Sequence, residues 1–288
     1  MAQTKDSYYV PHGSHWPVVG SVGLFLLMVG VSMWLNGSGI GSWITFAGIG
    51  VIVVMLFGWF GDVIDESEGG VYNAQVDKSF RMGMMWFIFS EVMFFAAFFG
   101  ALFYARSFVL PWLDGEGNNF FTNLLLWPGF EDTWPTNGPA DIGGEFQKMG
   151  ALGLPLINTA ILLTSSVTVT IAHHAIREGN RGMTALFLAL TFLLGYVFVG
   201  LQAYEYLHAY RDLNLTLESG IYGSTFFLLT GFHGMHVTIG AIMLTVIFLR
   251  VIRGHFTAKH HFAFEATAWY WHFVDVVWLG LYIFVYWL

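Results

Sequence analysis

Ionisable side chains stand inside the apolar C-terminal stretch of this chain of 288 residues. Glu265, His272 and Asp275 fall within the last 29 residues, and Asp275 is flanked by apolar and aromatic residues. A charge in hydrocarbon is costly, so such residues usually mark a proton relay, an ion site or a buried hydrogen-bonded group. On a helix these three side chains would cover one broad face.

Two further polar pairs occur in apolar stretches. Gln202 and Glu205 are three residues apart, and so are His233 and His236, which places each pair on one helix face. Together with the C-terminal residues they predict one buried hydrogen-bonded cluster that joins three helices, with each interhelical bond contributing about 0.6–2 kcal/mol. Paired histidines can also bind haem or copper. Haem needs an open apolar pocket between its ligands, which this spacing does not specify, so we expect no metal ligands here.

Glu91 is the most isolated of these groups, inside the apolar segment 84–100. Arg81 and Arg106 lie too far along the same helix to reach it, at about 1.5 Å per residue. A lone carboxylate in hydrocarbon favours its protonated form. It could serve a proton relay or an ion site, or it could be a structural acid bonded to a neighbouring helix. We favour the structural role, because a relay needs a chain of polar groups and the sequence near Glu91 offers none.

Composition identifies the setting of these groups. The chain is 56% hydrophobic, 18% aromatic and only 10% charged, whereas soluble domains are about 25% charged. The formal net charge of −8 argues against nucleic acid as a partner, because phosphate binding needs a basic surface. The absence of cysteine excludes disulfides and thiolate metal sites. The sequence therefore predicts an all-α polytopic membrane protein.

Apolar stretches of about 20 residues are long enough to cross a bilayer, and seven occur. They cover residues 16–35, 41–60, 82–108, 151–175, 184–207, 221–250 and 266–288. We expect a tail over 1–15, a helical hairpin over 16–60, a polar loop over 61–81 and a five-helix bundle over 82–288. The bundle contains the longest loop, 109–150, which is rich in Gly, Pro and Asn.

Most of the 11 basic residues fall on one side of this topology. That side holds Lys5, Lys78, Arg81, Arg177, Arg181, Arg250, Arg253 and Lys259, and the other holds Arg106, Lys148 and Arg211. Basic residues concentrate in cytoplasmic loops. We therefore expect a cytoplasmic N-terminus and a C-terminus on the outer side.

Basic and histidine side chains also gather after the sixth span. They are Arg250, Arg253, His255, Lys259, His260 and His261. Together with Trp59 and Glu66 after the second span, they could hold a phospholipid headgroup. The positive-inside bias alone would also place basic residues there. His12 and His15 could act as a proton antenna, because histidine exchanges protons near neutral pH.

Long motifs resemble one known family. They are FSEVMFFAAFF at 89–99, LPLINTAILLTSSVTVTIAHHAI at 154–176, LQAYEY at 201–206, GIYGSTFFLLTGFHGMHVTIG at 220–240 and HHFAFEATAWYWHFVDVVWLGLYIFVYW at 260–287. With these motifs the chain resembles subunit III of the haem–copper cytochrome c oxidases of the aa3 type. The resemblance extends from His15-Trp16-Pro17 to the C-terminus.

The resemblance implies a hairpin set apart from the bundle by a V-shaped cleft that holds structural phospholipids. It implies no haem, copper or catalytic residue in this chain, since those belong to the neighbouring subunits I and II, and cytochrome c is the substrate of the complex. The subunit would stabilise subunit I and support its proton uptake. Glu91 matches the family's carbodiimide-reactive acid, and the cleft positions match Trp59, Glu66, His236, Arg250, Arg253, His255 and His260.

The long loop 109–150 looks bacterial, which suggests the bacterial inner membrane with a periplasmic C-terminus. Two alternatives differ in class. The equivalent subunit of a quinol oxidase usually lacks the first two helices, both of which this sequence contains. A free-standing proton channel or transporter is suggested only by the acids within the spans.

Overall fold

The computed structural model describes residues 13–288, in which seven helices are long and apolar enough to cross a membrane and no strand occurs. The number of spans predicted from the sequence is confirmed. The chain divides into two compact units, one ending at Met82 and the other beginning at Gly83. Helix α3 (Ala74–Tyr104) starts in the first unit and continues in the second.

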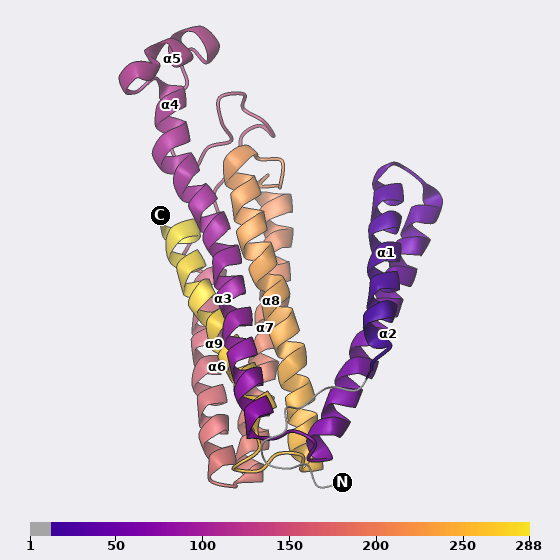
Figure 1. Cartoon of the computed structure of the whole chain (residues 1–288). Coiled ribbons are helices and arrows are strands. Elements are labelled where there is room, and N and C mark those ends of the chain that lie inside the picture. Colours follow the sequence, from indigo (N-terminus) through magenta and orange to yellow (C-terminus); the bar gives the residue numbers. More distant parts are fainter. Residues whose placement is uncertain (1–12) are drawn as a thin grey trace. The chain divides into compact units, whose positions relative to one another are not determined.

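The first unit contains the hairpin of α1 (Trp16–Leu35) and α2 (Gly39–Glu68) (Figure 1). The turn between them needs Gly37, whose φ is +80°, a conformation that other residues rarely adopt. Gly41 lets the two backbones touch, because a Cβ there would lie 2.3 Å from the Trp34 backbone nitrogen. At the other end the Trp16 indole N–H donates to Asp62 Oδ2 at 2.7 Å.

The second unit is a bundle of α3, α6 (Leu154–Arg177), α7 (Arg181–Asp212), α8 (Gly220–Arg253) and α9 (Phe262–Leu281) (Figure 1). A π-helical segment, η3 (Tyr282–Trp287), extends α9, and another, η1 (Ala105–Val109), extends α3. Proline at the start of α6 favours helix initiation there, because a first-turn residue needs no N–H donor.

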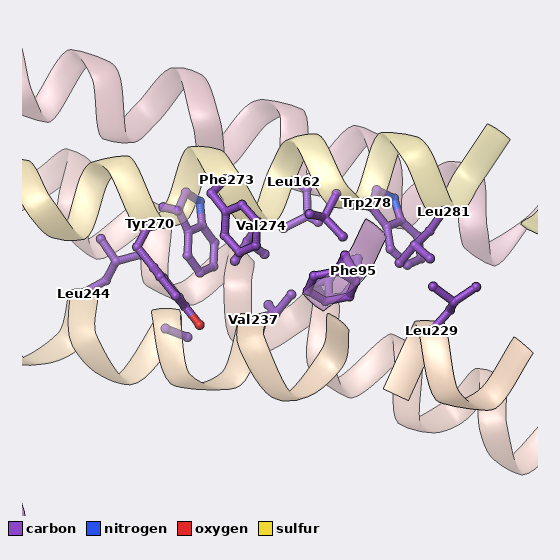
Figure 2. Packing of buried hydrophobic residues seen from close by; sticks show 14 of the residues in the cluster. Phe95, Leu162, Leu229, Val237, Leu244, Tyr270, Phe273, Val274, Trp278 and Leu281 are labelled. Carbon is purple, nitrogen blue, oxygen red and sulfur yellow. The ribbon is translucent and has the colours of Figure 1, made fainter. Parts of the chain in front are cut away.

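Helix α9 lies at the centre of the core, and 56% of its spanning window is buried. Figure 2 shows Tyr270, Val274 and Trp278 of α9 packed against residues of α3, α6 and α8, among them Phe95, Leu162 and Val237. Trp271 and Trp278 are among the largest fully buried side chains. The aromatic run that flanks Asp275 in the sequence is therefore core rather than lipid-facing surface.

The polar connections are shorter than the sequence suggested. Helix α2 runs to Glu68 and α3 begins at Ala74, so the loop predicted over 61–81 is confined to residues 69–73. The reason lies in local stabilisation of the first turns of α3. The Asn73 side chain accepts a backbone N–H three residues on, and Arg81 pairs with Asp77 at 2.8 Å.

The loop predicted over 109–150 also contains helices. Helix α3, η1 and α4 (Leu110–Asp114) form one continuous span of 41 residues. A 3-10 turn, η2 (Gly117–Asn119), and a short helix, α5 (Phe120–Leu126), follow. The remainder, up to α6, is irregular.

Candidate functional site

The buried tryptophans of α9 are hydrogen-bonded to hydroxyl groups of α6. Trp271 Nε1 donates to Ser165 Oγ at 2.9 Å, and Trp278 Nε1 donates to Thr159 Oγ1 at 2.9 Å. An indole N–H in an apolar core needs such an acceptor. Ser165 and Thr159 also donate to carbonyls of their own helix, so one hydroxyl serves both helices. These bonds fix the register of α9 against α6.

The polar face of α9 faces α6 as well. His272 Nδ1 lies 2.8 Å from Ser166 Oγ, and its Nε2 lies 3.4 Å from Thr170 Oγ1. The buried Asp275 has a carboxylate oxygen 4.0 Å from His272 Nδ1. The sequence predicted that these side chains form one cluster with the polar pairs of α7 and α8, and for His272 this was wrong, because its hydrogen-bond partners are on α6. The hydroxyl-rich face of α6 supplies the polar partners of His272, whereas both oxygens of Asp275 are buried without a hydrogen-bond partner in the part of the chain that the structure describes.

Gln202 and Glu205 of α7 lie elsewhere in the bundle. The fully buried Glu205 accepts a hydrogen bond from the Tyr286 hydroxyl at 2.7 Å, and Gln202 is buried one turn away. One residue after Glu205, the Tyr206 hydroxyl lies 2.7 Å from Thr230 Oγ1 of α8. The groups that the sequence placed in one cluster thus contact different partners: Glu205 contacts the Tyr286 hydroxyl, whereas His272 contacts hydroxyl groups of α6.

The two histidines of α8 contact different helices. His233 is fully buried and its Nε2 donates to the Val274 carbonyl of α9 at 3.2 Å. His236 Nδ1 donates to the Phe232 carbonyl at 2.6 Å, and its Nε2 lies 3.0 Å from Glu91 Oε2 of α3. The two side chains therefore do not converge as a ligand pair, and each is engaged in joining α8 to a neighbour.

The Glu91–His236 pair is the contact that sequence reasoning missed, because its members are 145 residues apart. The Glu91 side chain is 22% exposed and the His236 side chain 7%. With Nδ1–H committed to a carbonyl, Nε2 either donates to a carboxylate or accepts from a carboxylic acid. Both arrangements give the pair zero net charge, which suits an apolar setting. Rings of Phe94 and Phe95 pack against His236.

The positions expected to bind lipid are divided between the two units. In the first unit Trp59 is exposed, and Glu66 Oε2 accepts from the Tyr72 hydroxyl at 2.7 Å. In the second unit Arg250 is buried, with its guanidinium 4.5 Å from the centre of the Phe256 ring. Also in the second unit, Arg253 and His260 are exposed and His255 is half-buried.

The last predicted positions lie near the ends of helices. His15 is the exposed N-cap residue of α1, and its ring lies tilted against that of Trp16 with 4.3 Å between ring centres. His12 lies outside the described residues. Glu265, in the first turn of α9, groups with His173 of α6 and His261, and not with His272 and Asp275. No signal in the sequence links His173 to α9.

Comparison with known proteins gives one consistent family. Residues 6–114 and 120–288 match the family model described as "Cytochrome c oxidase subunit III". A relative from Coturnix japonica named "Cytochrome c oxidase subunit 3" is 42% identical over 288 residues, covering 100% of this chain and 99% of the relative. Relatives of the same name from Carassius auratus and Struthio camelus are each 41% identical, with the same coverage.

Proposed function

Because the chain belongs to the cytochrome c oxidase subunit III family, we propose that it is the non-catalytic accessory subunit of a proton-pumping cytochrome c oxidase. The observation that carries this proposal is the match to named relatives along the whole chain at about two residues in five. A similarity of this extent includes all seven spans and most of the residues that connect them, so it does not rest on one shared motif.

The geometry of the buried histidines supports a structural role. His233 spends its Nε2–H on the Val274 carbonyl, and both nitrogens of His236 have oxygen partners at 3.0 Å or less. A metal-binding histidine must offer a free lone pair to the ion, and both nitrogens of His236 are already engaged, whereas Nδ1 of His233 is buried without a hydrogen-bond partner among residues 13–288. These side chains instead join α8 to α9 and to α3. On this proposal, haem and copper belong to the partner subunits.

The proposed partners are subunits I and II, with cytochrome c as the substrate of the assembled complex. We place the chain in a bacterial inner membrane, with the N-terminus in the cytoplasm and the C-terminus in the periplasm. The distribution of basic residues between the two sides supports this orientation. The exposed His15 at the start of α1 would then face the cytoplasm, where it could supply protons to uptake by subunit I.

Phospholipid binding is the second part of the proposal, and Arg250 is its central residue. Arg250 sits in the last turn of α8 beside the Phe256 ring, with Arg253 one turn on, an arrangement suited to a phosphate headgroup. Changing Arg250 to Ala should reduce the lipid retained by the purified complex in native mass spectrometry. Arg211→Ala, which removes the same charge at the opposite end of the bundle, should leave it unchanged. Equal lipid content in both variants would reject the lipid site.

Purification through an affinity tag on this chain tests the assignment itself. We expect a haem-bearing subunit to co-purify and the complex to oxidise reduced cytochrome c. Oxidation of a quinol without oxidation of cytochrome c would favour the quinol oxidase alternative. Proton flux through the isolated chain in liposomes, without any haem-bearing partner, would overturn both oxidase assignments and favour a proton channel.

A further inference from the structure

Three residues at one end of the bundle bring suitable metal ligands together. His173 lies in the last two turns of α6, His261 is the residue preceding α9, and Glu265 is in the first turn of α9. His261 and Glu265 are four residues apart and therefore share one face. One ligand atom from each of the three residues lies within 4.8 Å of the other two.

The histidine rings are oriented for such a role. The Nδ1 of His261 lies 3.1 Å from the Thr257 carbonyl, to which it donates, so the lone pair of this ring is on Nε2. A carbonyl that fixes the tautomer in this way is the usual outer partner of a metal-binding histidine. The His173 ring packs against Phe264 and against the edge of His261, with ring centres 5.6 and 5.5 Å apart.

An unsatisfied nitrogen is the independent sign of a ligand. Nε2 of His173 is buried and has no hydrogen-bond partner among the described residues. Buried polar atoms are nearly always paired, so one that is not calls for a bound water or ion. Its neighbours His261 and Glu265 act on it electrostatically, as do Arg177 and His174 of its own helix.

From this geometry we propose that His173, His261 and Glu265 bind a divalent zinc ion that ties the end of α6 to the start of α9. Two imidazoles and one carboxylate match the preference of zinc, whereas magnesium and calcium prefer oxygen ligands throughout. Bonds of about 2.0–2.2 Å require ligand atoms about 3.4 Å apart, so the side chains must draw together by at most about 1.4 Å. Water would complete the coordination, and the Arg177 charge would keep the affinity moderate.

Each ligating histidine has an adjacent histidine that serves as a matched control. His174 and His260 are exposed and stand next to His173 and His261 in the sequence. Zinc should change the chemical reactivity of His173 and His261 and leave that of His174 and His260 unchanged. The site does not depend on the proposed function, because its residues all belong to this chain.

Chemical modification of the wild-type protein, purified with whatever chains accompany it, tests the site without any substitution. Diethyl pyrocarbonate modifies accessible imidazoles, and peptide mass spectrometry reports the rate at each histidine. Zinc at ten times its Kd leaves about one tenth of the sites free, so modification of His261 should slow about tenfold. His260 should react at an unchanged rate. Equal rates with and without zinc at His261, or equal protection of both histidines, would overturn the proposal.

Zinc content provides the second test. After equilibration with zinc and removal of the excess, the variant with His173→Ala and His261→Ala should hold one zinc fewer per chain than wild type. The control with His174→Ala and His260→Ala should hold as much as wild type. The same zinc content in both variants would contradict the site. If the first variant fails to fold, the modification rates of the wild-type protein still decide.

Discussion

The hairpin α1–α2 and the pair α6–α9 are both formed by apolar helices, but different contacts hold them together. In the hairpin, glycine brings backbone against backbone, as at Gly41 and Trp34. In α6–α9, buried indoles reach across to hydroxyl groups, as Trp278 does to Thr159. Lipid tails are as apolar as leucine, so helices in a membrane associate through close packing or hydrogen bonds rather than hydrophobic burial. The hairpin relies on close backbone packing along its span and has an indole hydrogen bond, Trp16 to Asp62, near one end, whereas α6–α9 has indole hydrogen bonds within its buried core.

The spans of the two units differ in how much of them is buried. Only 17% of each spanning window in the hairpin is buried, compared with 56% in α9. Large side chains such as Trp43 and Phe57 are exposed on the hairpin. A unit held by its backbone leaves its side chains free to contact lipid or a partner subunit, whereas a unit held by its side chains forms a rigid core. That contrast agrees with the proposed function, in which one part of the chain would bind lipid and another would support a neighbouring subunit.

The largest effect should come from breaking the backbone contact of the hairpin. Gly41→Val would place a side chain where the Trp34 backbone now lies, and overpacking of this kind costs about 3 kcal/mol. Gly50→Val is the matched control, because a Cβ there meets nothing within 4 Å. Unfolding in a detergent titration, followed by circular dichroism, should show the loss for Gly41→Val alone. Equal losses would mean that helix propensity, not contact, governs the hairpin.

The Glu91–His236 pair is the next test, this time of the polar contacts in the bundle. Glu91→Leu would leave the buried His236 Nε2 without its partner, which costs about 2 kcal/mol. Glu91→Gln keeps a hydrogen-bonding group in place and should cost clearly less. The same detergent titration compares the two variants. If both were equally destabilised, a charged carboxylate rather than a hydrogen bond would be the essential feature.

A smaller effect should appear as coupling between Trp278 and Thr159. Trp278→Phe removes the indole donor, and Thr159→Val removes the acceptor while keeping the shape of the side chain. A double-mutant cycle should give a coupling free energy of about 1 kcal/mol, as for other hydrogen bonds between membrane helices. Additive losses would show that packing alone holds α9 against α6.

The smallest effect is expected on the exposed face of the hairpin. Trp43 is 76% exposed, so Trp43→Ala should change the unfolding free energy of the purified chain by less than about 0.5 kcal/mol. Any weakening should instead appear in the complex, as easier loss of this chain at rising detergent concentration. A large loss of stability in the isolated chain would contradict the view that exposed side chains of the hairpin contribute little to its stability.

The spans could be predicted from the sequence, because an apolar stretch of about 20 residues has few alternatives in a membrane. The helix ends could not. The polar start of α3, from Ala74, is helical because a cap by Asn73 and an ion pair between Asp77 and Arg81 stabilise it. A polar helix end and a polar loop have the same kind of composition, so composition alone does not distinguish them.

The partners of the buried polar groups were less predictable. Spacing indicated which residues share a face, but not which helix lies opposite. His236 appeared to belong with His233, yet it contacts Glu91 on α3. The role of Ser166 and Thr159 as partners of α9 could not be predicted, because serine and threonine in helices usually bond to their own backbone. Only the packed bundle shows that they also serve α9.

Removal of this chain from the purified oxidase tests the central claim, that it supports a catalytic core without carrying the chemistry. The remaining core should keep its full haem and copper content and oxidise cytochrome c at first. It should then take up protons more slowly and lose activity sooner than the intact complex. Loss of haem or copper in proportion to the chain removed would contradict the account.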